Sequence, residues 1–139
     1  MTMWRLFLDA NVLFTAAHRP QGKAGFLFAE VAAGSPHWQL VSSVYAVEEA
    51  RRNIASKYPQ AAPELLRLTR QLKLADQPAT VRIALALPEK DLPIWAAALA
   101  CRATHLLTGD LKDFGRFMNR PEQTAGVMTQ TVSEFLVGL

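Results

Sequence analysis

The strongest constraint on the fold of this chain is that short apolar runs alternate with longer segments of helical periodicity. The run from Trp4 to Leu8 holds a single charge, and other short runs lie at 38–41, 105–107 and 127–129. The expected strands are 4–8, 38–41, 80–84, 105–107 and 127–129, and the expected helices are 11–17, 23–33, 44–57, 63–74, 92–102 and 132–137. Strands that alternate with helices form βα units with a mostly parallel sheet, so the predicted fold class is α/β.

Size and composition predict one domain that covers residues 1–139. No apolar run approaches the ~18 residues of a membrane span, and we expect no signal peptide from Met1 to Asp9, because the apolar stretch is too short and its acid comes too early. Cys101 is the only cysteine and the three histidines are scattered, which argues against a disulfide framework or a zinc site. The expected location is the cytoplasm, where a lone thiol stays reduced.

Acidic residues stand where a parallel sheet presents its ligand-binding edge, beyond the carboxyl ends of the strands. Asp9 follows the first expected strand, and Asp110 follows the fourth, with Asp113 one helical turn further along. Asp91 opens the alanine-rich helix, and the Glu48–Glu49 pair lies on the helix after the second strand. We therefore expect these acids to face one rim of the sheet.

Each acid also has an ordinary structural role, because aspartate is a common helix N-cap or turn residue and glutamate a common surface residue. These ordinary roles do not explain several carboxylates gathered at one place. Carboxylates ~5 Å apart repel by about 3 kcal/mol per pair at an effective dielectric near 20, unless some protonate or a cation neutralises them. An oxygen-only ligand set suits Mg²⁺ or Mn²⁺. One or two such ions can activate water for phosphodiester hydrolysis.

The charge balance is compatible with a polyanionic substrate. The formal charge is +3 from 15 basic and 12 acidic residues, and bound divalent ions would make it more positive. Basic side chains also lie close in sequence to the acids. The candidates for RNA phosphate contacts are Arg51, Arg52, Lys112 and Arg116, for each of which a plain solvated surface role is the alternative.

Four segments of the chain resemble the PIN domain family. Residues 6–13, LFLDANVL, look like the opening strand and turn of the family, and 49–54, EARRNI, look like its glutamate-bearing helix. Residues 91–100, DLPIWAAALA, are similar to its aspartate before an alanine-rich helix, and 106–114, LLTGDLKDF, resemble its closing Thr-x-Asp motif. The segments follow the family order and span essentially the whole chain.

This resemblance implies a three-layer α/β/α sandwich with a small, mostly parallel sheet, and a Mg²⁺- or Mn²⁺-dependent ribonuclease. It also implies that the protein is the toxin of a toxin–antitoxin pair of the VapC type, with RNA as substrate, a small antitoxin as partner and a homodimeric state. The implied catalytic and metal-binding residues are Asp9, Glu49, Asp91 and Asp110, and the supporting residues are Asn11, Thr108 and Asp113.

Two questions stay open at the level of sequence. Glu48 and Glu49 both lie off the apolar stripe of their helix, so periodicity does not choose between them, although the Glu-x-x-Arg-Asn-Ile context favours Glu49. The second question is whether the chain cleaves RNA or is a non-catalytic interaction module with the same fold.

Three other classes fit the sequence poorly. A receiver domain needs adjacent acids after the first strand and a lysine after the fifth, and a haloacid-dehalogenase-type phosphatase needs an aspartate where Asn11 stands. No glycine-rich nucleotide-binding pattern is present.

Overall fold

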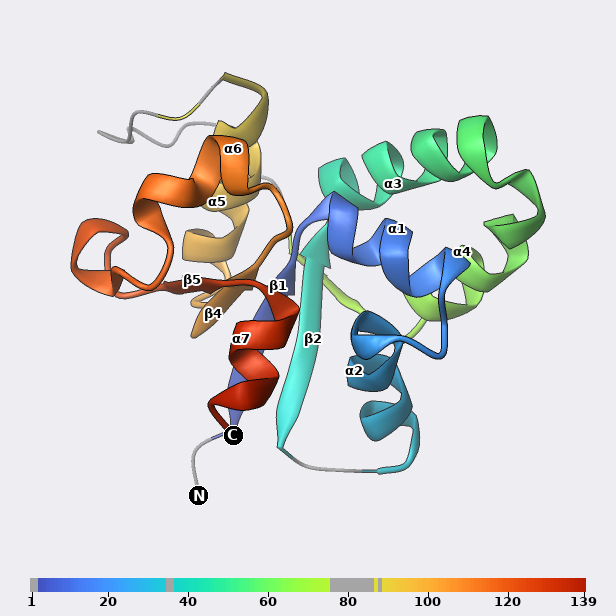
Figure 1. Cartoon of the computed structure of the whole chain (residues 1–139), viewed down its shortest axis with the longest axis horizontal. Coiled ribbons are helices and arrows are strands. Elements are labelled where there is room, and N and C mark those ends of the chain that lie inside the picture. The colour runs from blue at the N-terminus through green and yellow to red at the C-terminus, as the bar shows by residue number, and fades with distance from the viewer. Residues whose placement is uncertain (1–2, 35–36, 76–86, 88) are drawn as a thin grey trace.

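The computed structural model describes residues 3–34, 37–75, 87 and 89–139, and its centre is a five-stranded parallel sheet (Figure 1). The spatial order of the strands is β3-β2-β1-β4-β5, so β1 is central. The strands are β1 (Trp4–Leu8), β2 (Trp38–Ser43), β3 (Lys73–Ala75), β4 (His105–Leu107) and β5 (Met128–Gln130). All four neighbouring pairs are parallel, which agrees with the predicted α/β class.

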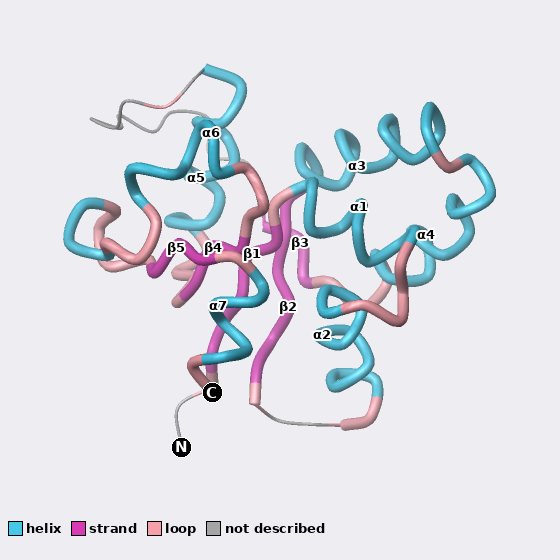
Figure 2. The backbone as a smooth tube through the Cα atoms, in the orientation of Figure 1, coloured by secondary structure: helices cyan, strands magenta, loops and turns pink. Residues whose placement is uncertain are grey.

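Helices cover both faces of this sheet (Figure 2). They are α1 (Ala10–His18), α2 (Lys23–Ala32), α3 (Val44–Lys57), α4 (Ala62–Thr69), α5 (Leu92–Ala100), α6 (Leu111–Phe114) and α7 (Val132–Val137). Short 3₁₀ turns lie at Pro59–Ala61, Glu89–Asp91, Gly115–Phe117 and Pro121–Gln123. Among the described helices, none is both long and apolar enough to cross a bilayer.

Successive residues of β1 contact opposite layers, which makes the molecule a three-layer α/β/α sandwich. The Trp4 ring packs edge-on against Phe135 of α7, with 5.4 Å between the ring centroids. The next side chain, Arg5, donates a hydrogen bond of 2.6 Å to the carbonyl oxygen of Cys101, directly after α5. Because neighbouring strand residues point to opposite faces, α7 and α5 lie on different sides of the sheet.

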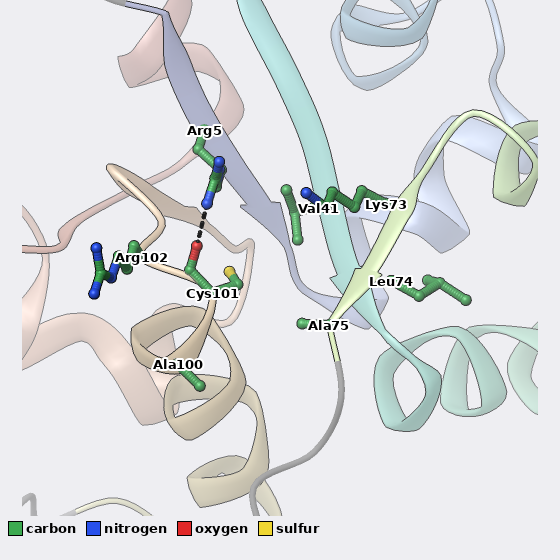
Figure 3. A pocket seen from close by; sticks show the side chains of 8 residues that line it. All are labelled: Arg5, Val41, Lys73, Leu74, Ala75, Ala100, Cys101 and Arg102. Carbon is green, nitrogen blue, oxygen red and sulfur yellow. Dashed lines mark hydrogen bonds between the residues drawn. The ribbon is translucent and has the colours of Figure 1, made fainter.

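Arg5 is the one charge in the first strand, and the structure accounts for it. It lines a cavity of about 200 Å³ between β1, β3 and the end of α5, and its guanidinium donates to the carbonyl of Cys101 at the end of the helix (Figure 3). A cation there compensates the partial negative charge of the helix C-terminus. The following residues of β1 form the centre of the core, since Leu6, Phe7 and Leu8 are 0% exposed.

The predicted helix 63–74 is wrong in its second half. The helix α4 ends at Thr69, whose hydroxyl donates a hydrogen bond of 2.8 Å back to the carbonyl of Leu65. After a tight turn, Lys73–Ala75 forms β3 and pairs in parallel with Val41–Ser43 of β2. Pairing with β2 therefore determines the structure of these residues, although their apolar periodicity would extend the helix. The predicted strand 80–84 lies outside the described residues.

Candidate functional site

Asp9 is held at the carboxyl end of the central strand by three hydrogen bonds. It is the N-cap of α1, and its Oδ1 accepts a bond of 2.7 Å from the backbone N–H of Ala10. Its Oδ2 accepts bonds from Asn11 Nδ2 at 3.1 Å and from the Thr108 hydroxyl at 2.8 Å. Burial outweighs these bonds, and repulsion from Glu49 and Asp110 adds to it, so the pKa of Asp9 rises to about 6.

Thr108 joins the two neighbouring strand ends. Its buried hydroxyl donates to Asp9 and also accepts a hydrogen bond of 3.0 Å from the backbone N–H of Asp110. The amide of Asn11 completes this bridge, because its Oδ1 accepts a bond of 2.6 Å from the N–H of Gly109. Asn11 and Thr108 thus fix the position of Asp9 relative to the loop that carries Asp110.

This bridge predicts a measurable stability effect for Thr108→Val. The change keeps the shape of the side chain but removes one of the three hydrogen bonds to Asp9 and leaves the Asp110 N–H without its partner, which costs about 1–3 kcal/mol of unfolding free energy. Thr129→Val is the matched control, because buried Thr129 Oγ1 has no hydrogen-bond partner among the described residues. Urea denaturation should show a loss for Thr108→Val and no loss for Thr129→Val. Equal losses would contradict the bridge.

Three aspartates form a compact cluster beside this bridge. One carboxylate oxygen from each of Asp91, Asp110 and Asp113 lies within 4.8 Å of the others. Asp110 is the N-cap of α6, and its Oδ1 accepts a hydrogen bond of 3.1 Å from the N–H of Asp113. Asp91 ends the 3₁₀ turn Glu89–Asp91 immediately before α5.

The cluster is electrostatically unfavourable at Asp91. This residue is 8% exposed, and its Oδ2 is buried with no hydrogen-bond partner among the residues that the structure describes. Burial, a hydrogen bond to Asp113 and the charge of Asp113 together raise the pKa of Asp91 to about 7. The same hydrogen bond from Asp91 lowers the pKa of Asp113, and Lys90 Nζ lies 3.5 Å from Asp113 Oδ2.

The structure separates the two adjacent glutamates. Glu48 is exposed and accepts a hydrogen bond of 2.8 Å from Arg51 Nε, which lowers the pKa of Glu48. Glu49 is half-buried and close enough to Asp9 for its charge to raise the pKa of Asp9. Of the two glutamates, Glu49 is therefore the one whose field reaches the aspartates.

Two residues near the acids carry no sequence signal. The Tyr45 hydroxyl of α3 donates a hydrogen bond of 2.8 Å to the carbonyl of Lys90, which ties α3 to the turn that holds Asp91. Burial and the charges of Glu49 and Asp91 raise the pKa of Tyr45. Lys90 faces the cluster, and the nearby Asp91 raises the pKa of its ammonium group. Lys90 directly precedes Asp91 in the sequence, whereas only the fold brings Tyr45 to the turn that holds Asp91.

The four basic residues expected to contact phosphate are all exposed. Arg51 is engaged with Glu48, whereas the charge of Arg52 reaches Tyr45 and lowers its pKa. Lys112 lies on α6, and Arg116 lies over the ring of Phe117 at 5.8 Å. The hydrogen-bonded pair with Glu48 occupies the Arg51 guanidinium, whereas the charge of Arg52 acts on a residue that contacts the turn of Asp91.

The donor set fits a hard divalent cation. The clustered ligands are carboxylate oxygens without histidine or thiolate, which is the ligand chemistry of Mg²⁺ and Mn²⁺. The buried, unpartnered oxygen of Asp91 is a costly arrangement in a folded protein unless a cation or a proton compensates it. Asp91, Asp110 and Asp113 are the residues that are placed to hold an ion, with Asp9 and Glu49 adjoining them.

Comparison with known proteins supports the architecture. No protein-family model and no curated protein matches the sequence. A chain of VapBC2 from Rickettsia felis, solved bound to a DNA fragment from their promoter, matches with a TM-score of 0.63 and 18% identity, covering 91% of this chain and 98% of that one. A chain of VapBC-1 from nontypeable Haemophilus influenzae matches with a TM-score of 0.57 and 18% identity, covering 93% and 98%. This chain therefore has the PIN-like α/β fold that the sequence resemblance implied.

Proposed function

We propose that this protein is a Mg²⁺- or Mn²⁺-dependent endoribonuclease that hydrolyses phosphodiester bonds at the acidic site. The observation that carries the proposal is the buried, unpartnered Asp91 oxygen inside a cluster of three aspartates at the carboxyl edge of the sheet. A fold tolerates such crowding of like charges when a cation offsets it. The proposed catalytic and metal-binding set is Asp9, Glu49, Asp91 and Asp110, with Asp113 as a further ligand.

Each side chain has a definite task in this proposal. One or two bound ions would polarise the scissile phosphate and lower the pKa of a water. Asp110 and Asp91 supply ligand oxygens, and the hydrogen bonds from Thr108 and Asn11 hold the Asp9 carboxylate in one orientation. Glu49 would accept a proton from an attacking water or hold a second ion. Lys90 offsets the charge of Asp113.

The decisive experiment is RNA cleavage with and without a divalent cation. We expect the purified chain to cleave single-stranded RNA in Mn²⁺, to stop in excess chelator, and to resume when Mn²⁺ is restored. Asp110→Asn should be inactive, and because asparagine is as good an N-cap as aspartate, it should keep α6 intact. Activity that persists in chelator would exclude the metal mechanism.

Glu48→Gln and Glu49→Gln form a matched pair for the glutamate assignment. Both remove one charge from the same helix, and we expect only Glu49→Gln to lose cleavage. If wild type and Asp110→Asn both leave RNA intact with Mn²⁺ present, the chain is instead the non-catalytic interaction module.

We further propose that the protein is the toxin of a toxin–antitoxin pair, restrained by a small antitoxin. The support is the fold shared with chains of two VapBC complexes. Co-expression with the product of the adjacent gene should give a stable complex in which RNA cleavage is suppressed. A homodimer and a cytoplasmic location belong to the same proposal, and light scattering on the purified chain tests the dimer.

A further inference from the structure

A groove next to the acidic site has the chemistry of a phosphate-binding track. It encloses a cavity of about 460 Å³ between α1, the start of α2 and the start of α7. Its lining begins at the acidic site itself, because it includes Asn11, Thr108 and Gly109, the residues that bridge Asp9 to the Asp110 loop. The groove therefore borders the residues that position Asp9 and the Asp110 loop.

The charge of this groove is opposite to that of the acidic site. Among the described residues that line it, Arg19 and Lys23 are cationic and none is acidic. Both cations are exposed, and neither takes part in an ion pair within the described part of the chain. Lys23 Nζ donates a hydrogen bond of 3.1 Å to the Ser133 hydroxyl, which orients the ammonium group and leaves it further donors.

The remaining polar groups of the groove suit a phosphate backbone as well. Thr15, Thr131 and Ser133 add hydroxyl groups to the lining. Phosphate oxygens accept hydrogen bonds from hydroxyls and from basic side chains, and such contacts position a nucleic acid without reading its sequence. The end of the groove formed by Asn11, Thr108 and Gly109 adjoins Asp9, so a polyanion bound along the groove can reach the acidic site.

We infer that this groove binds the sugar–phosphate backbone of the RNA substrate on one side of the scissile bond, with Arg19 and Lys23 as the phosphate contacts. The inference rests on the proposed nuclease function. It adds Arg19, which follows α1 directly, and Lys23, the first residue of α2, both distant in sequence from the acids other than Asp9. Substrate is thus held by the positive groove while its scissile phosphate lies at the acidic site.

The test separates binding from cleavage. Fluorescence anisotropy in chelator measures the affinity for a labelled single-stranded RNA oligonucleotide when no cleavage can occur. Arg19→Gln combined with Lys23→Gln should weaken binding about tenfold at moderate salt, with similar effects on oligonucleotides of different sequence. The slope of log K against log salt should fall by about 1.4, the value for two lost contacts to a single strand.

The control removes two equal charges elsewhere. Arg70→Gln combined with Arg102→Gln changes exposed residues outside the groove lining, and it should leave both the affinity and the salt slope unchanged. Equal weakening by the two double variants, unaltered binding by the groove variant, or no RNA binding by wild type would each overturn the inference. If metal-dependent cleavage persists in any of these cases, the nuclease function stands without the groove. If the groove variant alone loses binding but no cleavage occurs in Mn²⁺, the groove stands and the nuclease function falls.

Discussion

Replacing Asp91 by asparagine is expected to lower RNA cleavage at least about 100-fold while making the metal-free protein more stable. A ligand that supplies about 3 kcal/mol of transition-state stabilisation through a bound ion accounts for a rate loss of that size. The stability gain has a separate cause. The buried carboxylate of Asp91 has a pKa raised to about 7, so at pH 8 the folded protein holds a charge that its surroundings disfavour.

An asparagine removes that charge and can donate an amide hydrogen to Asp113. After allowance for screening by solvent and by Lys90, we expect the free energy of unfolding at pH 8 in chelator to rise by about 1–3 kcal/mol. Each kcal/mol corresponds to a rise of about 3–5 °C in melting temperature for a domain of this size. Calorimetry or urea denaturation, together with the cleavage assay, measures both effects on one preparation.

Asp113→Asn is the matched control for this trade between stability and activity. Asp113 belongs to the same cluster, but its pKa is lowered by the hydrogen bond from Asp91, so its ionised form is already stabilised. Removing its charge should leave stability unchanged or reduce it, and it also breaks the ion pair with Lys90. A stability gain in Asp113→Asn as large as that in Asp91→Asn would show that the penalty is not specific to Asp91.

Asp9→Asn is a less informative variant, for a reason visible only in the structure. The Asp9 carboxylate accepts hydrogen bonds from three donors, namely Ala10 N–H, Asn11 Nδ2 and Thr108 Oγ1. An asparagine would point its own N–H₂ group at one or more of them. The removal of a destabilising buried charge would then be offset by the loss of hydrogen bonds, so the net change in the free energy of unfolding would not isolate either effect.

Much of the fold could be predicted because local patterns and packing agree. The strand His105–Leu107 and the helices Val44–Lys57 and Val132–Val137 have the bounds that the sequence predicted. In each case a capping residue marks the helix start, since the Ser43 hydroxyl accepts a bond from Ala46 N–H and Thr131 forms a capping box with Glu134. Apolar periodicity then determines how far the element extends.

The sequence-based prediction fails where contacts between residues distant in sequence determine the secondary structure. β3 is three residues long, and two of them, Lys73 and Leu74, are exposed, so no apolar pattern marks it as a strand. It forms because the free edge of β2 offers backbone partners at Val41–Ser43. The short helix α6 was likewise not predicted, because it is a single turn whose start depends on the Asp110 cap.

The candidate site likewise has features that the sequence predicts and features that only the folded structure shows. The sequence predicts that acids at the strand ends lie together, because the carboxyl ends of parallel strands meet at one edge of the sheet. The sequence does not predict the different environments of Glu48 and Glu49, since both lie off the apolar stripe. Only the packing of α3 leaves Glu48 exposed and Glu49 half-buried. Arg19 and Lys23 gave no signal, because their groove is formed by three helices that meet only in the folded chain.

The second large effect is a fall in stability with rising pH when metal is absent. Asp9 and Asp91 have pKa values of about 6 and about 7 in the folded protein, above the value of 3.8 expected for an unfolded chain. The folded protein therefore keeps these protons over a range in which the unfolded chain has lost them. Their stabilising contribution is complete below pH 3.8 and is lost as pH rises through about 6 and 7.

We expect the free energy of unfolding in chelator to fall by about 3 kcal/mol between pH 4 and pH 7.5, which is the size of a two-unit shift at one buried carboxylate. Other carboxylates that gain hydrogen bonds on folding, such as Glu134 with its lowered pKa, oppose this trend at the acidic end. Urea denaturation over a series of pH values, with and without Asp91→Asn, measures the slope. The variant should lose the part of the fall nearest pH 7.

A divalent cation should reverse the slope, because it binds the ionised carboxylates of the folded chain and competes with their protons. At 100 times its dissociation constant, Mn²⁺ should add about 2.7 kcal/mol at pH 8 and little at pH 5, where Asp9 and Asp91 are protonated. Na⁺ at matched ionic strength controls for general screening. If stability in chelator is flat between pH 4 and 7.5, or if Mn²⁺ stabilises Asp91→Asn as much as wild type, the acids do not form a strained cation site.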